Sequence, residues 1–70
     1  MSFPTVQLRD LLTEDQLSEA SVLIDRIQYR KTPTNDLRAY LISQRESLEA
    51  RGVLPEYLFY ALVYQLHLPL

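Results

Sequence analysis

The sequence predicts an all-α fold, a small bundle of three main helices, and three observations lead to this prediction. Apolar residues recur at spacings of three and four along most of the 70-residue chain, and no segment has a convincing strand pattern. Four prolines and one glycine divide the chain into segments of helical length. Because the chain has the size of one domain and its connections are short, we expect a single helical domain over residues 1–70 with antiparallel hairpin packing.

Residues 1–12 allow two interpretations, an extended arm or a short N-terminal helix. Their apolar positions, Val6, Leu8, Leu11 and Leu12, fit either one. No signal peptide is expected, because the opening residues lack a basic start followed by an apolar run.

The first long helix is predicted over residues 14–31. Thr13 and Gln16 have the spacing of a capping box, in which each side chain satisfies a free backbone N–H group at the start of the helix. Acidic residues in the first turn suit the positive end of the helix dipole. One apolar stripe at helical spacing is expected to face the core: Leu17, Ala20, Ile24 and Ile27.

Proline and glycine set the bounds of the next two helices. Pro33 ends the first helix, because proline cannot extend it and disfavours helical backbone in the preceding residue. A second helix is predicted over residues 35–51, and Gly52 ends it in the left-handed conformation. Pro55 suits the first position of a last helix, predicted over residues 55–67.

Two further signals concern the ends and the buried side of these helices. Thr34 or Asn35 is expected to cap the second helix, and Pro69 to stop the last one. The residues that share one side of the second helix are Leu37, Tyr40, Leu41, Gln44 and Leu48.

The last helix carries two separate faces and hardly any polar one. At 100° per residue, Tyr57, Tyr60 and Tyr64 cluster on one side with His67 beside them. The opposite, mainly aliphatic face consists of Leu58, Phe59, Leu62, Val63 and Leu66. A helix that is apolar all round is normally buried, and 70 residues can hardly surround one helix completely.

Three interpretations of the tyrosines remain open. The rings lie half-buried against the other helices with their hydroxyl groups at the rim, or they contact another protein, or they line a small-molecule site. Tyrosine is enriched at the energetic centres of protein interfaces, which favours the second interpretation over the third. Val22 and Tyr29 form a weaker apolar strip on the first long helix and are candidates to extend such an interface.

A basic cluster closes the first long helix, formed by Arg26, Arg30 and Lys31. Such a cluster can contact phosphate groups, as in a small helical nucleic-acid binder. The net charge of −2 and the pI near 5.2 argue against this, and cations at a helix C-terminus already suit the dipole. Nucleic acid is therefore the less favoured partner, with these three residues as candidate anion contacts.

The composition offers little for catalysis. The chain has no cysteine, so it can form neither a disulfide nor a cysteine metal site. His67 is the one histidine and lies near the C-terminus, and a single glycine excludes a glycine-rich phosphate loop. We expect no enzyme activity, no catalytic residue, no cofactor and no metal.

The function we predict is that of a small adaptor or regulatory protein that binds other proteins through a helix face, as a homo-oligomer or within a larger assembly. A second chain is also one way to complete the core of so short a domain. The alternative is a small helical nucleic-acid-binding regulator. With no membrane span and no cysteine, a cytoplasmic location is expected.

Overall fold

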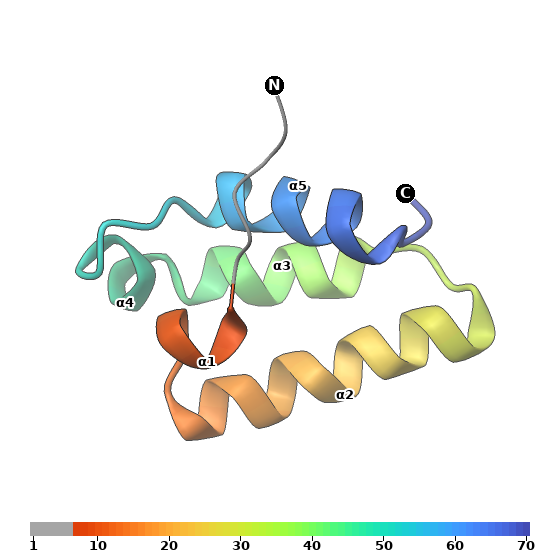
Figure 1. The fold of residues 1–70 in the computed structure, drawn as a ribbon, viewed down its shortest axis with the longest axis horizontal. Coiled ribbons are helices and arrows are strands. Elements are labelled where there is room, and N and C mark those ends of the chain that lie inside the picture. Colours follow the sequence, from red (N-terminus) through yellow and green to blue (C-terminus); the bar gives the residue numbers. More distant parts are fainter. Residues whose placement is uncertain (1–6) are drawn as a thin grey trace.

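The computed structural model describes residues 7–70 and confirms the all-α fold (Figure 1). Five helices follow one another, and no strand occurs in this part of the chain. Their bounds are α1 Leu8–Leu11, α2 Glu14–Arg30, α3 Asn35–Ser43, α4 Arg45–Glu49 and α5 Pro55–Leu66. Of the two interpretations of residues 1–12, the short helix is the one observed in the described part of this segment, where α1 forms a single turn. Residues 1–6 lie outside the described residues.

The three main helices run antiparallel in chain order, with α3 between α2 and α5 (Figure 1). The molecule is flat, with principal extents of 32 × 31 × 17 Å. Both α2 and α5 therefore pack against α3, and each has an outer side that no helix of residues 7–70 covers (Figure 1).

One apolar core joins the helices. The largest fully buried side chains are Leu37, Leu41, Leu48, Leu58 and Pro55, so α3, α4 and α5 supply its centre. From α2, the core receives three of the four predicted stripe residues, Ala20, Ile24 and Ile27, whereas Leu17 is only half-buried.

The polar side chain of Gln16 is buried beside this stripe and forms the predicted capping box. The Gln16 backbone N–H donates to Thr13 Oγ1 at 3.3 Å, and the Thr13 N–H donates to Gln16 Oε1 at 2.9 Å. The amide nitrogen of Gln16 then donates to Gln44 Oε1 at 2.6 Å, which connects the start of α2 to the end of α3. Arg51 adds a hydrogen bond to the carbonyl of Leu11 at 3.0 Å.

The prediction of one helix over residues 35–51 is wrong, because the chain bends at Gln44 and divides into α3 and α4. The backbone of Gln44 has φ −97° and ψ 16°, and its N–H group is shared between the carbonyls of Tyr40 and Leu41. Ser43 Oγ donates to the Tyr40 carbonyl at 2.5 Å, a local hydrogen bond that competes with the helix ladder. The bond from Gln16 holds the Gln44 side chain at this bend.

The other helix ends are close to the predicted ones. α2 ends at Arg30, one residue before the predicted end, and Lys31 follows as its C-cap in the left-handed conformation. Thr34 is the N-cap of α3, although its side chain makes no capping hydrogen bond. Gly52 has φ +78° as predicted, and the N–H of Val53 donates to the Leu48 carbonyl, which closes α4. Pro55 is the first residue of α5 as predicted.

The last helix ends at Leu66 rather than at residue 67, and Pro69 is not what stops it. His67 adopts φ 53°, and the N–H of Leu68 donates to the Val63 carbonyl at 3.2 Å. This pattern is a Schellman cap, which a buried apolar residue just after the helix often accompanies. Leu68 is that residue, because it folds back into the core.

We predict that Thr13→Ala lowers the free energy of unfolding by about 1 kcal/mol, because the substitution leaves the Gln16 N–H without its side-chain acceptor. Urea unfolding followed by far-UV circular dichroism measures the change. An unchanged unfolding midpoint would mean that the capping box does not stabilise α2.

A second prediction concerns the hydrogen bond between Gln16 and Gln44. Gln16→Ala removes this bond together with half of the capping box, so it should destabilise more than Thr13→Ala. In a double-mutant cycle, Gln16→Ala and Gln44→Ala should couple by roughly 0.5–1.5 kcal/mol. Gln28→Ala, at an exposed position of the same helix, is the control. Strictly additive effects of the two substitutions would contradict this role.

Candidate functional site

The position of α5 follows from its buried face. Leu58, Phe59 and Leu62 lie in the core, and Val63 and Leu66 are half-buried at its edge. The face predicted to hold this helix on the bundle is thus the face that does so. The remaining side of the helix is free to face outward.

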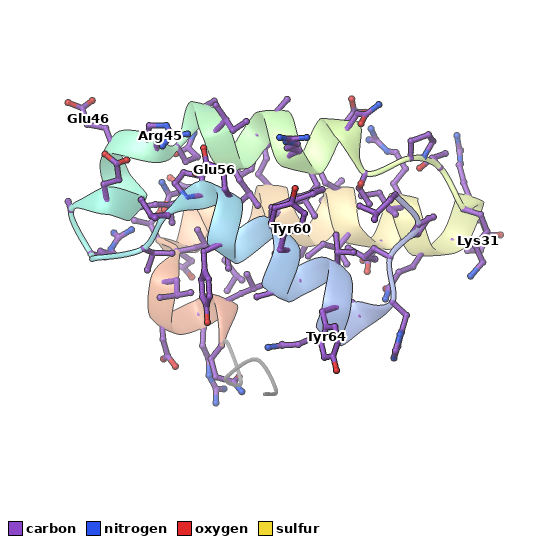
Figure 2. All side chains as sticks on the ribbon, turned by 90° about the horizontal axis from the view of Figure 1, so that it is seen from above. Lys31, Arg45, Glu46, Glu56, Tyr60 and Tyr64 are labelled. Carbon is purple, nitrogen blue, oxygen red and sulfur yellow. The ribbon has the colours of Figure 1, made fainter. Side chains whose placement is uncertain are left out.

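The three tyrosines lie on that outward side. The exposed fractions of these residues are 42% for Tyr57, 52% for Tyr60 and 59% for Tyr64, and His67 is also exposed. Figure 2 shows Tyr60 and Tyr64 on α5, with Tyr64 projecting outward. These four residues are called the tyrosine strip below.

The ring of Tyr60 is held in place by contacts with the bundle. The ring of Tyr60 meets that of Phe59 edge-on, with 5.5 Å between the centroids and 67° between the planes. Phe59 is itself buried, and the guanidinium of Arg38 lies 5.7 Å from its ring centroid. Phe59 therefore holds the Tyr60 ring against the bundle, while about half of each tyrosine is exposed.

The tyrosine strip is uncharged, and the charge nearest to it on α5 is paired. Residues 57–70 contain no Asp, Glu, Lys or Arg. Glu56 precedes the strip and forms a salt bridge with Arg45, which also binds Glu49 at 3.2 Å; Figure 2 shows Arg45 and Glu56 side by side. The hydrogen bond from Arg45 lowers the pKa of the Glu56 carboxyl group below its ordinary value of 4.5. This pair links α4 to the first turn of α5.

An apolar cleft of about 390 Å³ opens beside the first tyrosine of the strip. It lies between α1 and the start of α5, and Tyr57 belongs to both the cleft and the strip. Its other lining residues are Gln7, Asp10, Leu11, Gly52, Val53, Leu54 and Leu58. Sequence reasoning missed this cleft, because its walls come from segments some 40 residues apart. Within one segment, the only hint of the cleft is an apolar residue, Leu54, directly before the helix-starting Pro55; the structure shows it exposed.

The weaker apolar strip on α2 is exposed but separate. Val22 and Tyr29 are both exposed, Tyr29 by 88%. Because α3 lies between α2 and α5 (Figure 1), the structure does not bring these residues together with the tyrosine strip. They therefore do not extend it as one continuous row.

The basic cluster also stays on α2. Arg26, Arg30 and Lys31 are all exposed in the last turns of this helix and at its C-cap. Figure 2 places Lys31 at the end of the molecule opposite Arg45 and Glu46. The three cations are thus close in sequence and on one helix, apart from the tyrosine strip.

Acidic side chains on α2 influence the partly buried hydroxyl group of Tyr40. The hydroxyl of Tyr40 lies 3.5 Å from the Gln16 carbonyl oxygen, to which it donates. Burial raises its pKa, and the negative charges of Glu19 and Asp15 raise it further. Tyr40 therefore stays protonated and acts as a hydrogen-bond donor between α3 and α2.

Comparison with family models, with curated proteins and with solved structures finds no match to this chain. Within residues 7–70, no group of three His, Asp or Glu side chains is arranged to hold a metal ion. No helix in the same part of the chain is both long enough and apolar enough to cross a membrane.

We predict that the link between α4 and α5 weakens in acid. Because the folded-state pKa of Glu56 is lowered, the stabilisation by the Arg45–Glu56 pair is fully present above pH 4.5 and is lost as the pH falls through the lower, folded value. Both side chains are over 40% exposed, so the effect is small. Unfolding midpoints of wild type and Glu56→Gln should differ at pH 7 and converge in acid. A difference that persists unchanged at low pH would contradict this.

Proposed function

We propose that this protein is a small non-enzymatic adaptor or regulatory protein of the cytoplasm, which binds another protein chain through the tyrosine strip. The observation that carries the proposal is the row of Tyr57, Tyr60 and Tyr64 on the outward side of α5, each about half exposed beside an apolar cleft. A cysteine-free chain suits a reducing compartment.

The chemistry of the strip suits a protein partner. A tyrosine offers a large apolar ring and a hydroxyl group at the cost of ordering few torsion angles, which explains its enrichment at interface centres. The Tyr60 ring is already positioned by Phe59, so little further ordering accompanies binding. The cleft next to Tyr57 offers room for an apolar side chain of the partner.

The alternative function, a helical nucleic-acid-binding regulator, is supported by the exposed cluster of Arg26, Arg30 and Lys31 at the end of α2. Phosphate contacts of this kind give an affinity that falls steeply as salt rises. The net charge of −2 and the uncharged character of the strip favour a protein partner instead.

We predict that Tyr60→Lys abolishes protein binding without unfolding the chain, because it places a charge in the middle of the strip at a half-exposed position. The full chain is used as affinity bait in lysate of the cells that express it, and bound proteins are quantified by mass spectrometry. Proteins held by the wild type should be lost at least tenfold with Tyr60→Lys and retained with Gln28→Lys, which adds the same charge on α2. Far-UV circular dichroism checks that both variants stay helical.

Two outcomes would contradict the proposal. The first is a set of bound proteins that Tyr60→Lys leaves unchanged. The second is a salt-dependent affinity for DNA or RNA that disappears when Arg26, Arg30 and Lys31 are replaced by alanine, which would support the alternative function.

A further inference from the structure

We propose that the partner of the tyrosine strip is a second copy of this chain, bound as an antiparallel pair of α5 helices. The inference rests on the proposed function, since it names the occupant of the same surface. Four features support it: the spacing of the strip, its flanking residues, its lack of charge and its area.

The strip has the spacing of a helix–helix contact. Tyr57, Tyr60 and Tyr64 follow one another on α5 at intervals of three and four residues, which is the a/d pattern of two helices packed along their length. His67, the C-cap of α5, follows at the next interval of three. In an antiparallel pair, each a position faces a d position of the other helix. Tyr57 then faces the partner's His67, and Tyr60 faces the partner's Tyr64. All four residues of the strip are paired in this register.

Two exposed apolar residues flank α5 and the strip in the sequence. Leu54 precedes α5 and is 57% exposed, and Leu70 follows it and is 80% exposed. Antiparallel pairing brings the C-terminal residues of each copy toward the Leu54 end of the other, where the cleft opens. A parallel pair would leave each Leu70 far from this cleft.

The charge distribution permits self-association. No Asp, Glu, Lys or Arg occurs in residues 57–70, so the strip itself brings no such side chain into the contact. The nearest charges from other elements are of opposite sign, Arg38 over the Phe59 ring and Asp10 in the cleft beside Tyr57. Glu56, the nearest charge on α5, is bound by Arg45 of its own chain. Antiparallel helices also place opposite ends of their dipoles together.

The available area suits a reversible dimer. A buried aromatic side chain covers about 150–250 Å², and the tyrosines are about half exposed, so the three rings supply roughly 300 Å² per copy. Leu54, His67 and Leu70 bring this to on the order of 600 Å² per copy, at the lower limit of specific interfaces. A twofold contact of this kind is isologous, because the same patch serves both copies.

Sedimentation velocity of the full chain over a wide concentration range tests the dimer. The wild type should pass from monomer to dimer in the micromolar range. Tyr60→Lys and Tyr64→Lys should each weaken the dimer at least tenfold while circular dichroism stays helical, and Gln28→Lys should leave it unchanged. A wild type that stays monomeric at high micromolar concentration, or a dimer that both strip variants leave intact, would overturn the inference.

Disulfide cross-linking of single-cysteine variants tests whether the two α5 helices pair antiparallel. The wild-type chain has no cysteine, so no other disulfide can form. Under oxidation, a mixture of the two variants Tyr60→Cys and Tyr64→Cys should form a disulfide that joins one chain of each variant. Tyr57→Cys alone should not, because an antiparallel pair separates its two copies by about 15 Å along the helix axes. Rapid cross-linking of Tyr57→Cys to itself would indicate a parallel pair and overturn the proposed arrangement.

The two proposals fail separately. A monomeric wild type that still captures other proteins in a Tyr60-dependent way overturns the dimer and keeps the tyrosine strip as a binding surface. Capture that no strip substitution affects, together with a monomeric wild type, overturns both proposals.

Discussion

The structure depends on one buried polar side chain, that of Gln16. Its carbonyl oxygen accepts from the Thr13 N–H at the start of α2, and its amide nitrogen donates to Gln44 at the bend between α3 and α4. A buried amide costs stability unless its donors and acceptors are satisfied, so this side chain favours one arrangement of the two helices over others. Gln16 therefore sets both where α2 begins and where α3 ends.

The bend at Gln44 decides where the tyrosine strip lies. A straight helix over residues 35–51 would carry the chain about 10 Å beyond the end of α3 before it could turn back. Instead, α4 turns at Gln44 and Gly52 closes it, so that Pro55 begins α5 alongside α3. The Arg45–Glu56 pair then links α4 to the first turn of α5. With its buried face fixed on α3, α5 presents Tyr57, Tyr60 and Tyr64 outward.

The sequence predicted the features that local chemistry controls. The capping box at Thr13, the left-handed Gly52 and the first-position Pro55 depend on neighbouring residues only, and all three occur as predicted. The two faces of α5 follow from helical periodicity, and the burial of Leu58 and Leu62 agrees with it. That the outward face binds another chain remains a prediction.

The features that the sequence did not predict depend on contacts between distant segments. The bend at Gln44 involves a hydrogen bond from a residue 28 positions away, and nothing in the helical pattern of residues 35–51 indicates it. His67 adopts a left-handed backbone that glycine usually supplies, and the burial of Leu68 accompanies this conformation. The cleft needs α1 and Leu54 together, which only the folded chain provides.

We propose that the tyrosine strip is the surface at which two copies of this chain meet. Amide chemical shifts of the isotope-labelled full chain, recorded by NMR over a dilution series, test it most directly. We expect shifts that change with concentration along α5 from Tyr57 to His67 and near Leu54 and Leu70, while those around Val22 and Tyr29 stay constant. Changes centred on α2, or shifts that do not depend on concentration, would contradict it.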